Sequence, residues 1–299
     1  MSIRFGVSPI AWINDDMPEI GGGTALETVL GDARDIGFSG IELGSRFPRD
    51  PAALKALLGA YDLELVGGWY SANLLRRPPD EEIEALQPHL QLLKAMGSSV
   101  FILAETSNAI HGDMSRPLAQ TPRLPDEEWP EFGRRLSAVA HYIAEEGLRF
   151  AYHHHLGTVV EGAGDLENFL WHTGPEVGLT LDTGHAALGG FDPVQIIHEA
   201  PDRIAHVHCK DVRRDIFRQI IDGHGSFLKG VLEGMFTVPG DGGLDYAAVM
   251  NALVEISYSG WVVIEAEQDP AVADPRHYAS IGLATLRKEA AAAGLKEAA

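Results

Sequence analysis

Four short apolar stretches in the second half of the chain each run into side chains that can bind a metal ion. They are FAYHHH (150–155), VGLTLDTGH (177–185), IAHVHCKD (204–211) and WVVIEAE (261–267). Each has the length and aliphatic content of a buried strand, and each carries His, Asp or Glu at or just beyond its C-terminal end. In an α/β barrel, this end of the strands is where the chemistry is carried out.

Side chains two residues apart on a strand point to the same side of the sheet. Three sets in the stretches share a face in this way: His153 with His155, His206 with His208 and Lys210, and Glu265 with Glu267. If that face is the mouth of a barrel, the side chains converge. A mixed set of histidines and carboxylates without sulfur suits Mn²⁺, Co²⁺, Zn²⁺, Fe²⁺ or Mg²⁺.

Strand and helix patterns alternate along the whole chain. Further strands are predicted at 4–8, 40–43, 63–69 and 100–105. Helices are predicted at 24–36, 51–58, 80–96, 126–146, 165–171, 193–200, 246–256 and 277–293. Eight strands alternating with helices, without a linker or a shift in composition, predict one α/β domain over 1–299, a (β/α)8 TIM barrel. The long connection at about 212–237 predicts an inserted helical segment, a lid or a subunit contact.

Composition restricts the partners. The chain has 299 residues, of which 43 are acidic and 23 basic, and its formal charge is -20. This charge repels phosphate backbones and anionic lipid surfaces, so nucleic acid and membrane are not expected partners. No apolar run approaches the ~20 residues that span a bilayer, and Cys209 is the single cysteine. We expect a cytoplasmic enzyme that acts on a small molecule.

Several motifs resemble a known family. DTGH (182–185), HVHCKD (206–211), VPGDGGLDY (238–246) and GWVVIEAEQDP (260–270) resemble the xylose-isomerase-like barrels, which include sugar isomerases, epimerases and apurinic endonucleases. PIAWINDDMPEIGGG (9–23), ELGSRFP (42–48), HGDMSRP (111–117) and YHHHLGT (152–158) resemble, more narrowly, the inosose dehydratase family of myo-inositol breakdown. The resemblance covers nearly the whole chain. It implies dehydration of 2-keto-myo-inositol (scyllo-inosose) to a trihydroxycyclohexane-1,2-dione.

The resemblance also implies a set of metal ligands. Asp182, His208 and Glu265 match the family's pattern plainly. Many relatives have Glu at the end of the fifth strand, where this chain has His153. Glu161, in the loop that follows, resembles a carboxylate that binds the metal in other relatives, and it is our predicted fourth ligand, with His153 and His155 as alternatives. Mn²⁺ or Co²⁺ is the expected ion, and Mg²⁺, Zn²⁺ and Fe²⁺ are compatible with the ligands.

Other roles follow from the resemblance and from the chemistry of dehydration. His185 is expected to bind a substrate oxygen, and Lys210 to stabilise an oxyanion or protonate the leaving group. Glu265 is expected to combine the roles of ligand and base. The second proton transfer has four unranked candidates: His153, His155, Glu267 and His111.

Some residues have two interpretations at this point. Trp12 and Trp69 follow barrel strands and are candidates to stack on a sugar ring, or else to plug the rim of the core. Glu42 and Glu105 are substrate contacts or salt-bridged scaffold. The Asp15–Asp16 doublet is interpreted as the cap of a turn.

Three other functions compete with dehydration. A metal-dependent isomerase or epimerase of a ketose or related polyol ketone would use the same site, but such enzymes typically have paired glutamates across the metal. An apurinic-site endonuclease needs a basic groove, which the charge of -20 disfavours. A non-catalytic sugar-binding barrel is disfavoured by Asp182, His208 and Glu265. Related barrels often form dimers or tetramers, so a homo-oligomer is compatible with the fold.

Overall fold

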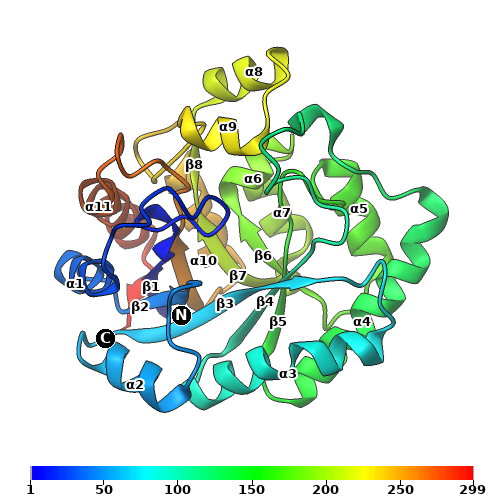
Figure 1. Ribbon diagram of the computed structural model, residues 1–299, viewed down its shortest axis with the longest axis horizontal. Helices are drawn as coiled ribbons and strands as arrows, with labels where there is room; N and C mark the ends of the chain where they lie inside the picture. The colour runs from blue at the N-terminus through cyan, green and yellow to red at the C-terminus, as the bar shows by residue number, and fades with distance from the viewer. Residues whose placement is uncertain (1, 299) are drawn as a thin grey trace.

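Eight parallel strands close into a barrel in the computed structural model, which describes residues 2–298 (Figure 1). The barrel strands are β1 (Ser2–Val7), β2 (Gly40–Leu43), β3 (Glu64–Ala72), β4 (Val100–Glu105), β5 (Arg149–His153), β6 (Gly178–Asp182), β7 (Ile204–Cys209) and β10 (Gly260–Ile264). Pairing of β1 with β10 closes the sheet, and β11 (Lys296–Glu297) adds to the outer side of β1. The predicted (β/α)8 barrel is therefore confirmed.

Helices surround the strands (Figure 1). They are α1 (Leu26–Ile36), α2 (Pro51–Gly59), α3 (Pro79–Met96), α4 (Trp129–Glu145), α5 (Ala163–His172), α6 (Thr183–Leu188), α7 (Pro193–Glu199), α10 (Tyr246–Glu255) and α11 (Pro275–Ala293). Three of them end where a glycine adopts a left-handed conformation: Gly37 (φ 104°), Gly97 (φ 77°) and Gly294 (φ 84°). A side chain is strained at such angles, so glycine allows the chain to turn back toward the next strand.

Alternation along β7 separates the core from the barrel interior. Val207 and Cys209 pack in the main hydrophobic core, which lies between strands and helices. His206 and His208 point the other way, into the barrel. A predominantly apolar layer thus surrounds an interior that is polar at its carboxyl end.

Below this polar region the interior is filled. Val66, Trp261 and Val263 form a small buried cluster. The Trp261 ring occupies the space that a side chain at position 40 would need, because a Cβ on Gly40 would lie 2.6 Å from the ring. The guanidinium of Arg4 lies 4.0 Å from the ring centroid. These contacts block the amino-terminal end of the barrel.

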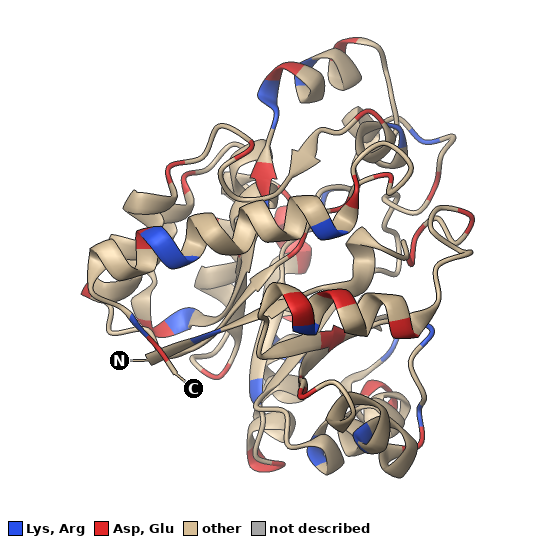
Figure 2. Ribbon diagram, turned by 90° about the vertical axis from the view of Figure 1, so that its left-hand side faces the viewer, with Lys and Arg blue, Asp and Glu red and all other residues tan. Residues whose placement is uncertain are grey.

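Residues 211–237 form a separate layer over the carboxyl ends of the strands. β8 (Asp211–Val212) pairs with β9 (Phe236–Thr237), and α8 (Arg214–Asp222) and α9 (Phe227–Leu232) lie between them in sequence. A second hydrophobic cluster joins this layer to the loops after β1 and β5 through Met17 and Leu156. In Figures 1 and 2, α8 projects beyond the ring of barrel helices.

Charged residues are distributed over the outer surface. In the view of Figure 2, short segments of Lys and Arg are scattered among the acidic residues and form no basic stripe. Within residues 2–298, no helix is long and apolar enough to cross a bilayer.

A histidine in α3 gives a testable contribution to acid stability. His89 Nε2–H donates to the carbonyl of Gly68 at 3.1 Å, and burial lowers the pKa of His89 to about 4 from 6.5. Below pH 6.5 the unfolded chain therefore binds more protons at this position, so stability falls as pH falls from 6.5 to about 4.

The wild type should lose free energy of unfolding between pH 7.5 and pH 4.5. We expect this loss to be about 2 to 3 kcal/mol smaller in His89→Gln. Urea unfolding of metal-free protein at the two pH values measures this difference. His141→Gln is the control, because the side chain of His141 is 62% exposed. An unchanged difference for His89→Gln would contradict the prediction.

Candidate metal centre and acid–base cluster

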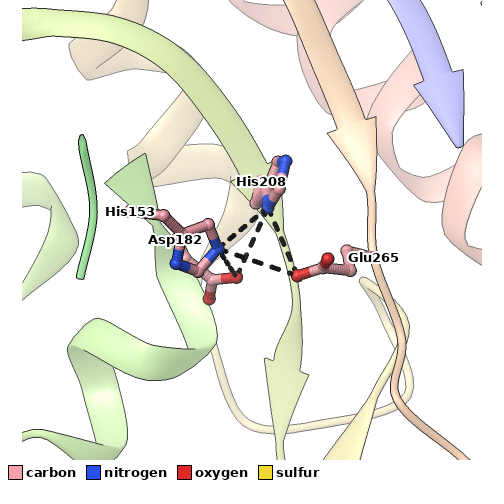
Figure 3. Close-up of side chains that lie close together, drawn as sticks. All are labelled: His153, Asp182, His208 and Glu265. Atoms are coloured by element: carbon pink, nitrogen blue, oxygen red, sulfur yellow. Dashed lines mark hydrogen bonds and ion pairs between the residues drawn. The ribbon is translucent and has the colours of Figure 1, made fainter. Parts of the chain in front are cut away.

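Four side chains converge from four strands at the carboxyl end of the barrel (Figure 3). They belong to His153 at the end of β5, Asp182 at the end of β6, His208 on β7 and Glu265 just after β10. His153 Nε2 lies 3.2 Å from His208 Nδ1 and 3.7 Å from Asp182 Oδ2. Glu265 Oε2 lies 3.2 Å from His208 Nδ1 and 4.0 Å from His153 Nε2.

The geometry of this cluster fits a divalent ion. An ion about 2.0–2.2 Å from each ligand holds neighbouring ligand atoms about 3 to 4 Å apart. Asp182 supplies independent evidence, because its Oδ2 is buried and has no hydrogen-bond partner within residues 2–298. Its other oxygen, Oδ1, accepts from the backbone N–H groups of Gly184 and His185 at the start of α6. A buried carboxylate oxygen without a partner is costly, and a cation would satisfy it.

Burial and neighbouring charge set the protonation of the two carboxylates. Burial raises the pKa of Asp182 to about 6, although Lys210 opposes the shift. Burial also acts to raise the pKa of Glu265, but the charges of Lys210 and His208 outweigh it and hold this pKa well below its usual range. Glu265 is therefore anionic at neutral pH.

The structure places Glu161 apart from this cluster, which corrects our prediction of the fourth ligand. Its Oε2 accepts from Gly157 N at 2.6 Å and from Thr121 Oγ1 at 2.8 Å. These bonds tie the loop after β5 to the loop after β4. His153, one of the two alternatives, is the fourth member of the cluster.

A second cluster adjoins the first. His155, His185 and Glu267 approach one another, with His185 Nε2 3.7 Å and His155 Nε2 3.9 Å from Glu267 Oε1. The ammonium of Lys210 lies 2.5 Å from Glu267 Oε1 and 3.1 Å from His185 Nε2. It also lies 2.9 Å from Glu265 Oε2, so one buried cation connects the two clusters.

His155 has a fixed tautomer. Its Nδ1 lies 2.7 Å from the carbonyl oxygen of Leu156, which can only accept, so Nδ1 carries the proton. Burial lowers the pKa of His155 well below its usual value. The imidazole is thus neutral with its lone pair at Nε2, which is the form that a general base requires.

Glu267 has the complementary property. Burial raises its pKa to about 7, against the opposing charge of Lys210. Its Oε2 is buried, and none of the residues that the structure describes forms a hydrogen bond with it. A carboxyl group that titrates near neutral pH can donate a proton to a leaving group.

A cavity opens above both clusters. It has a volume of about 190 Å³, the room that about six water molecules take in the liquid, so it suits a small molecule. Its wall includes Trp69, His111 and Asp16. Residues of both clusters also line it: His153, His208, Glu265, His155 and Glu267. Trp69 makes edge contacts with the rings of His153, His155 and His111.

Five predicted site residues lie outside the cavity wall: Asp182, Glu161, Lys210, His185 and Trp12. Lys210 and His185 are completely buried behind it, so neither touches the cavity. Trp12 belongs to the hydrophobic core, where its Nε1–H donates to Asp32 Oδ2 at 3.0 Å. Of the two interpretations of Trp12, the structure therefore favours the core plug, and His185, which was expected to bind a substrate oxygen, lies behind the cavity wall.

Two further carboxylates, those of Asp16 and Glu42, lie at the cavity, and a third, that of Glu105, does not. Asp16 lines the cavity, and the turn is capped by Asn14, whose Oδ1 accepts from the N–H groups of Asp16 and Met17. Glu42 also lines the cavity and accepts hydrogen bonds from His206 and His208. Glu105 is scaffold, with its oxygens on the N–H groups of Leu74 and Ser107.

Comparison with known proteins places this barrel in a family. Residues 30–289 match the family model described as xylose isomerase-like TIM barrel. The chain belongs to this family, and within it to the group that contains the inosose dehydratases and the rhizopine catabolism protein MocC.

The matches cover most of the length of each relative. The chain is 46% identical over 296 residues to MocC of Rhizobium meliloti, covering 99% of this chain and 91% of that protein. It is 39% identical over 281 residues to inosose dehydratase of Lacticaseibacillus casei, covering 93% and 94%. The solved structure of an L-ribulose 3-epimerase shares the fold, with a TM-score of 0.68, 18% identity and coverage of 98% and 96%.

Proposed function

We propose that the protein is a metal-dependent hydro-lyase that removes water from 2-keto-myo-inositol, forming a trihydroxycyclohexane-1,2-dione. One observation carries the proposal: a small cavity brings the cluster of His153, Asp182, His208 and Glu265 next to a neutral histidine and a carboxyl group of raised pKa. The close relatives named inosose dehydratase support the choice of substrate.

The residues of the second cluster have complementary roles in this reaction. His155 Nε2 takes the proton from the carbon beside the ketone, and the electron pair of that C–H bond forms the new double bond. The carbon–oxygen bond at the next carbon breaks, and protonated Glu267 gives its proton to the departing hydroxyl, which leaves as water. The enol that remains becomes the dione. Lys210 touches Glu267 from behind and orients its carboxyl group, so it is a positioning residue.

The first cluster would hold a divalent ion, and Mn²⁺ or Co²⁺ is the expected one. Such an ion supplies a Lewis acid for a ketone and its neighbouring hydroxyl. Asp182 and Glu265 provide the anionic oxygens for it, and His153 and His208 the nitrogens. Trp69 covers one side of the cavity with an apolar ring, against which the C–H face of a cyclic polyol can pack.

The test is a direct assay. Protein freed of metal with a chelator is incubated with 2-keto-myo-inositol, with and without Mn²⁺ or Co²⁺. We expect an ultraviolet-absorbing dione only with the ion. If the loaded protein leaves this substrate unchanged but interconverts ketoses, it is an epimerase, the runner-up. If neither substrate reacts, the proposal fails.

A further inference from the structure

Glu42 makes a contact across the interior of the barrel. Its Oε1 lies 2.9 Å from His208 Nε2 and 3.0 Å from His206 Nε2, and its side chain is almost fully buried. Strand β2, which carries Glu42, is not a neighbour of β7 in the sheet order β10-β7-β6-β5-β4-β3-β2-β1. The contact therefore forms only when the barrel closes, and no local pattern determines it.

This contact determines which nitrogen of His208 carries a proton. An ionised carboxylate can only accept hydrogen bonds, so Nε2 of His208 must be the donor. In the neutral imidazole the lone pair is then at Nδ1. Nδ1 is the atom that faces His153, Asp182 and Glu265. The ring is thus held in the tautomer and orientation that a metal ligand needs.

The other histidine of the cluster has no such support. His153 presents Nε2 to the cluster, and its Nδ1 is buried without a hydrogen-bond partner among the described residues. Of the two imidazoles, only that of His208 is oriented by a carboxylate. The preorganisation of the nitrogen ligands therefore depends on Glu42.

The backbone around Glu42 is irregular in a way that supports this placement. Between β2 and β3 the register shifts, with Ile41 opposite Leu65 but Leu43 opposite Gly68. Two residues of β3 thus face Glu42 alone. Such bulges redirect side chains and are common next to active sites. A Cβ on Gly68 would lie 2.8 Å from Leu43 Cβ, so the shifted register needs glycine there.

We propose that Glu42 is a positioning residue that sets the affinity of the centre for its divalent ion by holding His208. The inference rests on the proposed metal centre. Its basis is the hydrogen bond from His208 Nε2 to Glu42 Oε1 and the opposite ring nitrogen facing the cluster. This role is additional to the two considered for Glu42 from the sequence, a substrate contact or a scaffold salt bridge.

The test compares the affinity of three variants for Co²⁺ alone, by titration against a competing chelator and by visible absorption. Glu42→Gln keeps the shape of the side chain but removes its charge, and its amide can donate to His208 Nε2 and reverse the tautomer. We expect Glu42→Gln to bind Co²⁺ about 10- to 100-fold more weakly than the wild type.

Two controls separate this effect from general damage. Glu105→Gln alters another buried carboxylate, at the end of β4, which accepts from the backbone N–H groups of Leu74 and Ser107 and lies outside the cavity wall. His206→Gln removes the other partner of Glu42 but leaves its bond to His208. We expect both controls to bind Co²⁺ within about 3-fold of the wild type, because neither removes the hydrogen bond between Glu42 and His208.

The outcomes are distinct. If the wild type itself does not bind Co²⁺, the proposed metal centre fails, and this inference with it. If the wild type binds and Glu42→Gln binds equally well, only the role of Glu42 is overturned. Equal weakening in Glu42→Gln and Glu105→Gln would also overturn it, since it would show a loss common to buried carboxylates. The melting temperatures of the metal-free variants verify that each one folds.

Discussion

Asp182→Asn is expected to abolish both metal retention and turnover while leaving the fold intact. The amide oxygen of Asn can still accept from the N–H groups of Gly184 and His185, so the start of α6 keeps its cap. The anionic Oδ2, which faces the cluster without a partner, is lost. We expect Co²⁺ affinity to fall by more than about 100-fold, beyond the loss from removing an outer support, and kcat by about 10³-fold or more.

Metal content after dialysis, kcat on 2-keto-myo-inositol and thermal unfolding of the metal-free protein measure these effects. The matched control is Asp192→Asn, which changes an aspartate that caps α7 through the N–H of Val194, away from the cavity. Both metal-free variants should melt within about 4 °C of the wild type. An Asp182→Asn protein that retains its ion and its activity would exclude Asp182 from the centre.

Lys210→Met is expected to reduce both activity and stability while the ion stays bound. The Lys210 ammonium is completely buried within 2.9 Å of Glu265 Oε2 and 2.5 Å of Glu267 Oε1. Without it, two buried carboxylates lose their only shared cation. We expect the free energy of unfolding of the metal-free protein to fall by about 3 to 5 kcal/mol at pH 8 and kcat to fall by about 10²- to 10³-fold.

The stability loss should depend on pH with a definite sign. The pKa of Glu267 is already raised to about 7 by burial, and Lys210 lowers it, so removing Lys210 raises this pKa further. A carboxyl group whose pKa is higher in the folded than in the unfolded state lowers the free energy of unfolding when it ionises. Stability therefore falls as pH rises toward the pKa of the folded state. The effect of Lys210→Met should therefore shrink on acidification below pH 7.

Urea unfolding at pH 6 and pH 8 tests this dependence. Lys229→Met is the control, because its surface ion pair with Glu233, at 3.6 Å at the end of α9, contributes about 0.5 kcal/mol or less. Equal stability losses for the two variants, or a loss for Lys210→Met that grows at low pH, would contradict the assignment.

The parts of the site that follow strand periodicity could be predicted from the sequence. Alternation along 204–211 placed His206 and His208 on one face, and the structure has them together inside the barrel, with Cys209 in the core behind them. The same argument predicted a common face for Glu265 and Glu267. Local periodicity is sufficient here because a barrel strand has only two faces.

The choices that depend on loops and on contacts across the barrel could not be predicted in this way. Glu161 and His153 are both candidates for the fourth metal ligand in the sequence. In the structure, Thr121, which lies 40 positions from Glu161, donates a hydrogen bond to the carboxylate of Glu161, away from the cluster. Asp16 reaches the cavity because the loop after β1 folds back over the mouth, where the Asp15 carboxylate accepts from Ser45. Such contacts between distant segments leave no mark in a single sequence.

The plug formed by Trp261 beneath the site has a consequence for the traffic of small molecules. With its ring filling the space beside Gly40 and capped by Arg4, the cavity is blind-ended. The substrate and the product must therefore use the same opening of the cavity, one after the other. The product should therefore compete with the substrate for the cavity, and accumulated product should inhibit the enzyme competitively.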